Sequence, residues 1–457
     1  MITKTVKQIS EMIKIENDLS EFQNIEVRGL SIDSRKIEQG NLFVPFKGEN
    51  SDGHRFVEEA IQKGAAAAFW QKDVPNPPLH LPILIVEDTL LALQELARAY
   101  RNMLNVRIVG ITGSNGKTTT KDMTANLLAI EYKVQKTEGN FNNEIGLPLT
   151  ILALEEDTEI AVLEMGMSSR GEIDFLTRLA RPEAAIITNI GESHLLDLGS
   201  REGITEAKLE IINGLQENGL VTYYGDEPLL SEKLLDYKGN IMIKTFGRRG
   251  INNIYPVDIE QNDNGSVFST NVSNSEFKLP VLGTHNVLNA LAAMTVANQF
   301  GVPYEKMNEG FAKLKLTNMR TELLQGRKGE KIINDAYNAS PTSMHAAIEL
   351  LSHLPGYKNK ILVLGDMLEL GPEEKNFHLK MGESIDPNKI NYVLTFGKLG
   401  EWIAEGARKK LPADHVFSFT EKQLLIEKIE KLVDEETIVL VKASRGMKLE
   451  EIIAALQ

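Results

Sequence analysis

The sequence predicts an α/β protein built from three α/β domains. Its 457 residues exceed the length of one ordinary domain. Short apolar runs alternate with helical patterns in two separate series, which is typical of parallel sheets with helical crossovers. A polar stretch rich in turn residues lies between the two series. We therefore predict domains over residues 1–100, 101–316 and 317–457.

The first domain is predicted to combine short strands with helices. The segment "NLFVPFKG" predicts a strand, and "HRFVEEAIQKGAAAAF" predicts an amphipathic helix followed by a buried strand. A second helix, over "TLLALQELARAYRNML", leads out of this domain.

The other two domains are each predicted to contain a parallel sheet. The central strands are "VRIVGIT", "EIAVLEMG", "AAIITNI" and "GLVTYY", followed by small antiparallel strands within "NNIYPVDIEQNDNGSVFSTNVSNSEFKLP". The segment "HNVLNALAAMTVANQFG" predicts a helix that ends at Gly301, a position suited to a C′ glycine. The third domain is expected to hold five strands: "KIINDAY", "KILVLGDM", "YVLTFG", "HVFSF" and "TIVLVKAS".

Composition excludes several functional classes. A formal charge of −14 argues against a general nucleic-acid-binding protein, whose surface is usually basic. The sequence has no cysteine, which excludes disulfides, thiolate zinc sites and a cysteine nucleophile and fits a reducing compartment. Charges interrupt the N-terminal "MITKTVKQISEMIKI", and the apolar runs are short, so we expect neither a secretory signal nor a membrane span. We expect a cytoplasmic protein.

The segment "VRIVGITGSNGKTTTKDM" predicts a strand, a glycine-rich loop and a helix. The backbone N–H groups of such a loop, together with the helix N-terminus, bind anions. Lys117 is placed to reach the β- and γ-phosphates of a nucleotide, and the Thr118 hydroxyl to bind Mg²⁺. The standard P-loop pattern expects glycine at Ile111, so an ordinary glycine-rich turn is the alternative. The predicted phosphate-binding residues are Gly113, Ser114, Asn115, Gly116, Lys117, Thr118 and Thr119.

Two polar residues that follow neighbouring predicted strands are candidate metal ligands. A P-loop needs a metal-binding carboxylate at the end of a nearby strand, and Glu164 directly follows the apolar run 160–163. An exposed glutamate at the end of a strand is the alternative. His194 follows the next strand, where it could bind a second divalent ion or form a hydrogen bond within its loop.

Two helical segments carry further polar candidates. Lys208 lies in a helical pattern, "GITEAKLEIINGL", and most helical lysines are solvated, which is the interpretation that the local sequence favours. Asn286 and Asn289, which follow His285, are three residues apart and can share one helix face. Their amides could contact a purine or cap the helix.

The segment "TGSNGKTTT" resembles the P-loop of the Mur ligase family, the ATP-dependent amino-acid ligases of peptidoglycan synthesis, and this accounts for the departure at position 111. The resemblance covers essentially the whole chain. It implies a small α/β N-terminal domain, a central P-loop parallel-sheet ATPase domain and a C-terminal Rossmann-like domain. The order and approximate spacing of the family are matched by Glu164 in "EMGM", His194 in "TNIGESHL", Asn289 in "HNVLNALAA", Arg320 in "NMR" and Asp335 in "INDAYNASP".

Further segments resemble particular activities within the family. "TNIGESHLLDLGSREGITEAKLEI", "DAYNASPTSM" and "LVLGDMLELG" resemble the member that adds D-alanyl-D-alanine to UDP-N-acetylmuramoyl-tripeptide. "DSRKIEQGNLFVPFKGENSDGHRFVEEAIQKGA" resembles the UDP-binding domain that this member shares with the preceding ligase, which adds the third amino acid. That ligase is the alternative, although we find no D-x-P-R-type motif in the third domain.

The resemblance implies that ATP phosphorylates a substrate carboxylate and that an amine then displaces phosphate. It implies two Mg²⁺ ions, one held by Thr118 and Glu164 and the other by His194, and a carbamylated Lys208. Asn289 is expected to hold adenine, Asp335 the ribose and Arg320 a phosphate. The expected substrate-binding residues are Asp33, Ser34, Arg35, Gly53 and His54 for the uridine diphosphate, Asn140, Asn142 and Asn143 for the central cleft, and Tyr337, Asn338 and Ser340 for D-alanyl-D-alanine.

These expectations leave three rival classes open. A folylpolyglutamate synthase-like ligase shares the chemistry but would not need a UDP-binding N-terminal domain. A small-molecule kinase would use the same loop without an amine acceptor, and a non-catalytic switch would bind ATP without turnover. We expect the two small-molecule substrates as partners, no nucleic acid, and a monomer.

Overall fold

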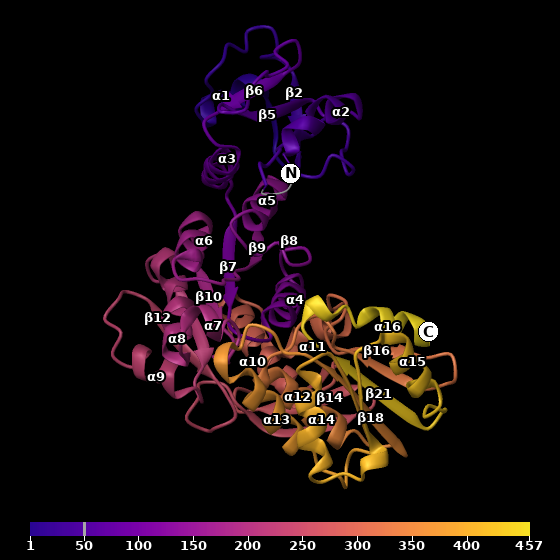
Figure 1. Ribbon diagram of the computed structural model, residues 1–457. Helices are drawn as coiled ribbons and strands as arrows, with labels where there is room; N and C mark the ends of the chain where they lie inside the picture. The colour runs from indigo at the N-terminus through magenta and orange to yellow at the C-terminus, as the bar shows by residue number, and fades with distance from the viewer. Residues whose placement is uncertain (49–51) are drawn as a thin grey trace.

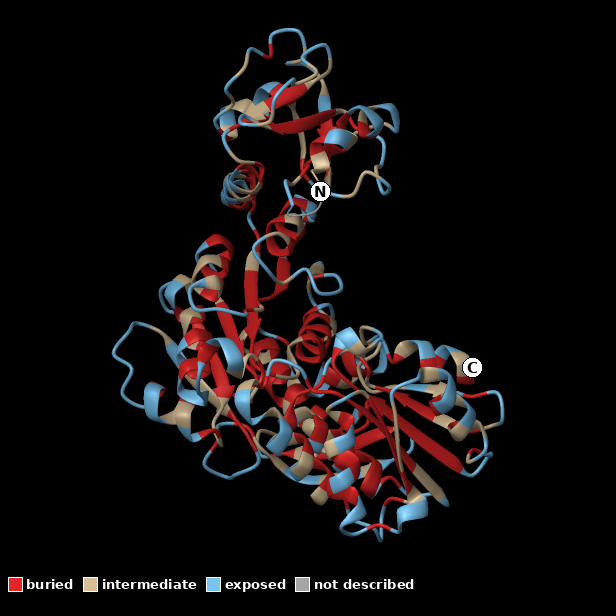
Figure 2. Cartoon of the chain, viewed as in Figure 1, coloured by how far each residue is buried: buried red, intermediate tan, exposed pale blue. Residues whose placement is uncertain are grey.

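The computed structural model describes residues 1–48 and 52–457 and places them in three α/β domains. In Figure 1 the N-terminal domain stands apart at the top, while the central and C-terminal domains lie side by side below it. Each domain has its own sheet and a buried interior, drawn red in Figure 2. No helix in the described ranges is long and apolar enough to cross a membrane.

The N-terminal domain has a four-stranded parallel sheet in the order β3-β4-β5-β6 and a separate antiparallel pair, β1 and β2. The two predicted helices and the buried strand are present, but the strand predicted over "NLFVPFKG" has only two residues. The elements are β1 (Thr3–Thr5), α1 (Val6–Met12), β2 (Glu26–Arg28), β3 (Leu30–Ser31), β4 (Leu42–Phe43), α2 (Val57–Gln62), β5 (Ala67–Gln71), β6 (Ile83–Val86) and α3 (Thr89–Met103).

The central domain has a six-stranded parallel sheet in the order β12-β11-β10-β7-β9-β8. All four predicted strands are present in its interior. The two edge strands were not predicted, because they are only partly buried and lack a continuous apolar run. The elements are β7 (Arg107–Thr112), α4 (Lys117–Leu128), β8 (Val134–Lys136), α5 (Gly146–Ala153), β9 (Ile160–Glu164), α6 (Glu172–Ala180), β10 (Ala184–Ile187), α7 (Leu195–Leu198), α8 (Arg201–Leu209), β11 (Leu220–Tyr224), α9 (Pro228–Leu234) and β12 (Met242–Phe246).

A small antiparallel sheet and a buried helix complete this domain. The sheet has the order β13-β14-β15 and confirms the prediction for this turn-rich stretch. Helix α10 stops where predicted, because Gly301 follows its C-cap with a φ of +95°, a conformation that favours glycine. The elements are β13 (Pro256–Asn262), β14 (Gly265–Thr270), β15 (Ser273–Leu279), α10 (Thr284–Gln299) and α11 (Met307–Ala312).

The C-terminal domain has a six-stranded sheet in the order β16-β17-β21-β18-β19-β20. The five predicted strands are parallel, whereas β16 was not predicted and pairs antiparallel with β17 at the edge. The elements are β16 (Glu322–Gln325), β17 (Lys331–Asn334), α12 (Pro341–His353), β18 (Asn359–Gly365), α13 (Glu374–Glu383), β19 (Tyr392–Phe396), α14 (Gly400–Arg408), β20 (Val416–Phe419), α15 (Lys422–Glu430), β21 (Thr437–Lys442) and α16 (Glu450–Leu456).

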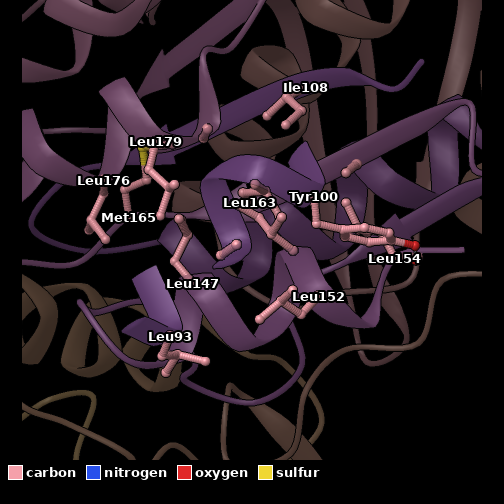
Figure 3. Close-up of a cluster of buried hydrophobic side chains, with 14 of the residues drawn as sticks. Leu93, Tyr100, Ile108, Leu147, Leu152, Leu154, Leu163, Met165, Leu176 and Leu179 are labelled. Atoms are coloured by element: carbon pink, nitrogen blue, oxygen red, sulfur yellow. Dashed lines mark hydrogen bonds between the residues drawn. The ribbon is translucent and has the colours of Figure 1, made fainter. Parts of the chain in front are cut away.

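One hydrophobic cluster joins the N-terminal and central domains (Figure 3). It packs Leu93 and Tyr100 of α3 against side chains of α5 and α6 in the central domain. The Tyr100 hydroxyl donates to the backbone oxygen of Leu154 over 2.9 Å, and the buried Arg101 guanidinium donates to that of Ala180, also over 2.9 Å. Helix α3 therefore attaches the N-terminal domain firmly to the central sheet.

We expect the change Leu179→Ala, at the end of α6 in this cluster, to lower the free energy of unfolding by about 2–5 kcal/mol, because it leaves a cavity in a packed core. Leu179 is 1% exposed. The matched control is Leu235→Ala, since Leu235 is 81% exposed; it should change the free energy by less than about 0.5 kcal/mol. Urea unfolding followed by circular dichroism measures both, and equal effects would contradict the packing argument.

Candidate active site between the central and C-terminal domains

A cavity of about 520 Å³ lies between the carboxyl ends of the central strands and the C-terminal domain. This volume is typical of a small-molecule site. Contacts across the cavity bring the two domains together at the P-loop. The Ser340 hydroxyl donates to Oδ1 of Asn115 over 3.1 Å, and Nη2 of Arg320 donates to the Thr118 hydroxyl over 3.3 Å.

The predicted P-loop connects β7 to α4, and glycine is required at two of its positions. Gly113 has a φ of +143°, and a Cβ there would lie 1.8 Å from Oγ1 of Thr188. Gly116 has a φ of +80°, and its Cβ would lie 2.6 Å from Oδ1 of Asn289. The backbone thus approaches its neighbours more closely than any side chain would allow. Ser114, Asn115, Gly116, Lys117, Thr118 and Thr119 all line the cavity.

Lys117 lies at the first position of α4, with its ammonium turned back onto the loop. Nζ donates to the backbone oxygens of Gly113 over 2.9 Å and Ser114 over 3.3 Å. Burial lowers the pKa of Lys117, with a further contribution from the charge of Arg320, while Glu164 opposes the shift. The hydrogen bonds of the ammonium therefore go to the backbone of its own loop.

Glu164 and Thr118 meet at the carboxyl end of β9. The Thr118 hydroxyl donates to Oε2 of Glu164 over 2.9 Å, and the Asn142 amide donates to Oε1 over 2.8 Å. Glu164 is 2% exposed, so it is not a solvated glutamate at a strand end. A hydroxyl and a carboxylate at this distance are the hard oxygen ligands that Mg²⁺ prefers, with phosphates and water completing its octahedron.

His194 lies in the loop after β10 and faces the C-terminal domain. Its Nδ1 is 2.9 Å from Oε2 of Glu369, although the two groups are not aligned for a hydrogen bond. Burial lowers the pKa of His194, and Lys117 and Lys208 lower it further against the opposing charge of Glu369. The described residues contain no cluster of three or more histidine, aspartate or glutamate side chains that could hold a metal. A cation here would need ligands besides these side chains.

Lys208 is 1% exposed, so the local sequence interpretation of a solvated lysine is wrong. The helical pattern correctly placed it on α8, but this face of α8 packs against the domain interior rather than solvent. Burial, together with the charge of Lys117, lowers the pKa of Lys208 well below its ordinary value. The side chain can therefore reach a neutral, nucleophilic state far more easily than a surface lysine.

The first turns of α10 line the other end of the cavity. The Asn289 amide donates to Oδ1 of Asn286 over 2.9 Å, so the two side chains share one face as expected. Neither caps the helix, because Gly283 is at the N-cap and Asn286 donates to the backbone oxygen of Leu282 over 2.7 Å. His285, Tyr224 and Arg248 also line this end.

The C-terminal domain contributes a second polar wall. The Lys442 ammonium donates to Oδ2 of Asp335 over 2.6 Å and to the backbone oxygen of Asn338 over 3.0 Å. The Arg320 guanidinium lies over the Tyr337 ring, 4.0 Å from its centre. All five residues line the cavity. Sequence reasoning missed Lys442, although it ends the predicted strand "TIVLVKAS" just as Glu164 ends its own strand.

Thr188 and Asn189, which directly follow β10, hold the P-loop in place. Sequence reasoning did not identify either residue. The Thr188 hydroxyl donates to the backbone oxygen of Asn115 over 2.5 Å, and Oδ1 of Asn189 accepts from the Asn115 N–H over 3.0 Å. Both residues lie in the segment "AAIITNI", so their position at a strand end was again the available signal.

The remaining predicted residues lie in different surroundings. Asn142 and Asn143 line the cavity, whereas Asn140 is exposed outside its lining. Asn143 accepts from the N–H of Gly146 over 2.9 Å, at the start of α5. Ser340 caps α12 as well as contacting the P-loop.

The residues expected to bind uridine diphosphate lie in the N-terminal domain. Asp33 lines a second cavity, of about 970 Å³, between this domain and the central one. It forms an ion pair with Arg35 over 2.8 Å, which lowers the pKa of Asp33. The other four predicted residues, Ser34, Arg35, Gly53 and His54, are outside the lining of this cavity. His54 is buried, with Nδ1 2.6 Å from Oδ1 of Asp52 and Nε2 accepting from the N–H of Gln71 over 3.0 Å.

The chain is similar to Mur ligases over nearly its whole length. Residues 26–101 match the Mur ligase family catalytic domain, 111–297 the Mur ligase middle domain and 319–445 the Mur ligase glutamate ligase domain. UDP-N-acetylmuramoyl-tripeptide–D-alanyl-D-alanine ligase from Bacillus subtilis is 53% identical, covering 99% of this chain and 98% of that protein. The crystal structure of MurF from Acinetobacter baumannii has a TM-score of 0.89 at 29% identity, covering 100% of this chain and 99% of that one. MurF ligase from Thermotoga maritima, in complex with ADP, has a TM-score of 0.82 at 31% identity, covering 94% and 97%.

We expect Gly113→Ala to weaken ADP binding by about 10-fold or more, which corresponds to at least about 1.4 kcal/mol, because the added methyl group forces the P-loop away from Thr188. Isothermal titration calorimetry measures the affinity. The matched control is Gly301→Ala, because Gly301 also has a positive φ but a Cβ there makes only an ordinary contact, at 3.7 Å, with the Tyr132 hydroxyl. If the two variants lose affinity equally, close packing of the P-loop is not what requires Gly113.

Proposed function

The chain belongs to the Mur ligase family, and from this premise we propose that it joins D-alanyl-D-alanine to UDP-N-acetylmuramoyl-tripeptide, converting ATP to ADP and phosphate. The main support for this proposal is that the chain is 53% identical, over 99% of its length, to the Bacillus subtilis ligase named for these substrates. The product, a UDP-N-acetylmuramoyl-pentapeptide, serves peptidoglycan synthesis. The absence of cysteine from the sequence supports a reducing compartment, and we place the reaction in the cytoplasm.

The reaction has two steps. A carboxylate oxygen of the tripeptide attacks the γ-phosphorus of ATP, and ADP leaves, which produces an acyl phosphate. The amine of D-alanyl-D-alanine then attacks the acyl carbon; phosphate leaves, and the nitrogen loses one proton as the amide forms. Both the carboxylate and the triphosphate are anions, so the first step needs positive charge around the γ-phosphate.

Two cationic side chains from different domains are available for that purpose. Lys117 at the start of α4 would contact the β- and γ-phosphates. Arg320 of the C-terminal domain would face the same phosphates, since its Nη2 lies against the Thr118 hydroxyl. Its Nε is buried and has no hydrogen-bond partner among the described residues, which supports an anionic ligand that completes its bonding.

The oxygen ligands at the end of β9 fit a magnesium ion. Thr118 and Glu164 would hold one Mg²⁺. The lowered pKa of His194 favours the neutral ring, which would bind a second. When bound, these ions screen the phosphate and carboxylate charges. Asn142 orients the Glu164 carboxylate through its amide.

Lys208 is proposed to be carbamylated. The lowered pKa favours its neutral amine, which can attack carbon dioxide at carbon and release one proton, leaving a carbamate. The new negative charge would interact favourably with the positive charge of Lys117. It would also supply oxygen ligands to the cation at His194, where the described residues offer few.

The remaining residues are proposed to bind the ends of the substrates. Asn289 would hold the adenine and Asp335 the ribose. The cavity beside Asp33 would receive the uridine diphosphate, with Ser34, Arg35, Gly53 and His54 shaping the surrounding loops. We assign the peptide to the region around Asn140, Asn142 and Asn143, and D-alanyl-D-alanine to that around Tyr337, Asn338 and Ser340. Packing of the C-terminal domain over the P-loop would keep water from the acyl phosphate.

The activity is tested by phosphate release from Mg-ATP with UDP-N-acetylmuramoyl-tripeptide, with and without D-alanyl-D-alanine. We expect release to require the dipeptide and a pentapeptide product to be detected by mass spectrometry. Release with UDP-N-acetylmuramoyl-dipeptide and a diamino acid would instead identify the preceding ligase reaction. Lack of amine-dependent release with either pair would refute a peptidoglycan ligase.

The carbamate is tested by carbon-13 NMR of the protein in ¹³C-bicarbonate. We expect a carbamate signal that disappears in Lys208→Met and persists in Lys360→Met, a control whose lysine also has a pKa lowered by burial. The Lys208→Met variant should also lose about 100-fold in kcat, as is typical when an outer ligand of a metal site is removed. A signal that survives in Lys208→Met would place the carbamate elsewhere.

A further inference from the structure

Asp122 is a fully buried carboxylate for which the reaction described above has no role. It lies on α4, one helical turn after Thr118, at 0% exposure. Its Oδ2 accepts two hydrogen bonds from one residue of the linker to the C-terminal domain: from the N–H of Thr317 over 2.8 Å and from its hydroxyl over 2.9 Å. The helix that begins in the P-loop is therefore bonded directly to the start of this linker.

Two lysines fix the orientation of this carboxylate. Nζ of Lys136 donates to Oδ1 over 2.5 Å, and Nζ of Lys121 lies 3.5 Å from the same atom. Lys121 is itself held by the backbone oxygen of Thr137 over 2.8 Å. A buried carboxylate persists only with such partners. Because both lysines lie at Oδ1, Oδ2 is left to face Thr317.

The linker contacts α4 at two points, and the chain between the two linker residues is long enough to span the distance between the two helix residues. Asp122 and Thr118 are four residues apart on one helix face, which corresponds to about 6 Å along the axis. Thr317 and Arg320 are three residues apart, and an extended chain of that length spans at most about 10 Å. The linker bonds Asp122 at Thr317 and Thr118 at Arg320.

The backbone on both sides of Arg320 is strained. Met319 has a φ of +62° and Thr321 a φ of +54°, in the left-handed region that is unfavourable for a β-branched residue. Their N–H groups are held by Glu322 Oε2 over 3.1 Å and Asp335 Oδ1 over 3.2 Å. Such a conformation persists only where surrounding contacts impose it. On the central-domain side these contacts are the Asp122–Thr317 bonds and the Arg320–Thr118 bond.

We propose that Asp122 is a positioning residue that anchors the linker at Thr317 and thereby places Arg320 at the triphosphate. The inference rests on the proposed function of Arg320 as a phosphate ligand. Asp122 itself touches no substrate. Asp122 affects catalysis only through the position of Arg320. Loss of the Asp122–Thr317 contact therefore has no further effect once the Arg320 guanidinium has been removed.

The test is a double-mutant cycle between Thr317 and Arg320, with dipeptide-dependent phosphate release as the readout. Thr317→Val removes the hydroxyl while keeping the side-chain shape and the backbone N–H. We expect it to lower kcat about 10-fold, as for the loss of a hydrogen bond to a buried charge. Thr317→Ser restores the hydroxyl and should return kcat to within about 2-fold of the unmodified protein. Thermal unfolding of each variant establishes that it is folded.

The cycle separates positioning from general stability. We expect Arg320→Ala to lower kcat about 100-fold and the double variant Thr317→Val/Arg320→Ala to lower it no further. Independent effects would multiply to about 1,000-fold, and that result would overturn the inference while leaving the ligase activity intact. An Arg320→Ala variant with unchanged kcat would overturn the phosphate role of Arg320 and the inference with it. Absence of dipeptide-dependent release in the unmodified protein would refute the proposed function itself.

Discussion

The hydrogen bond from the Thr118 hydroxyl to the Glu164 carboxylate is the contact around which the site is organised. It joins the P-loop, at the start of α4, to the end of β9. Because β7 lies between β9 and β10 in a parallel sheet, polar groups from all three strand ends meet at one edge.

The second constraint is that neither domain forms the cavity alone. The central domain supplies a loop of backbone N–H groups and the Glu164 carboxylate, but the wall that faces them belongs to the C-terminal domain. Ser340 and Arg320 bond to the P-loop from that wall. A reaction through an acyl phosphate depends on this arrangement, because the intermediate hydrolyses if water reaches it before the amine does.

Much of this could be predicted from sequence, since it depends on local pattern. Buried strands carry continuous apolar runs, so β7 and β9 were predicted, and their ends pointed to Glu164. Edge strands such as β12 and β16 are half exposed and lack that signal. Lys208 shows a different limit: periodicity assigns a residue to a helix face, but only the packed structure reveals what covers that face. The contact between Arg320 and Thr118 joins residues 202 positions apart, which no local pattern encodes.

The site contains positively charged side chains, although the protein as a whole is negatively charged. The chain carries a formal charge of −14, yet Lys117 and Arg320 both line one cavity. Burial lowers the pKa of Lys117, which means that the folded protein holds this cation unfavourably when no anion is present. An anionic ligand relieves that cost in the native state alone, so its binding and the stability of the closed domain arrangement are linked. The same desolvation that destabilises the empty cavity strengthens each cation's attraction for phosphate, and this allows an acidic protein to bring a triphosphate and a carboxylate together.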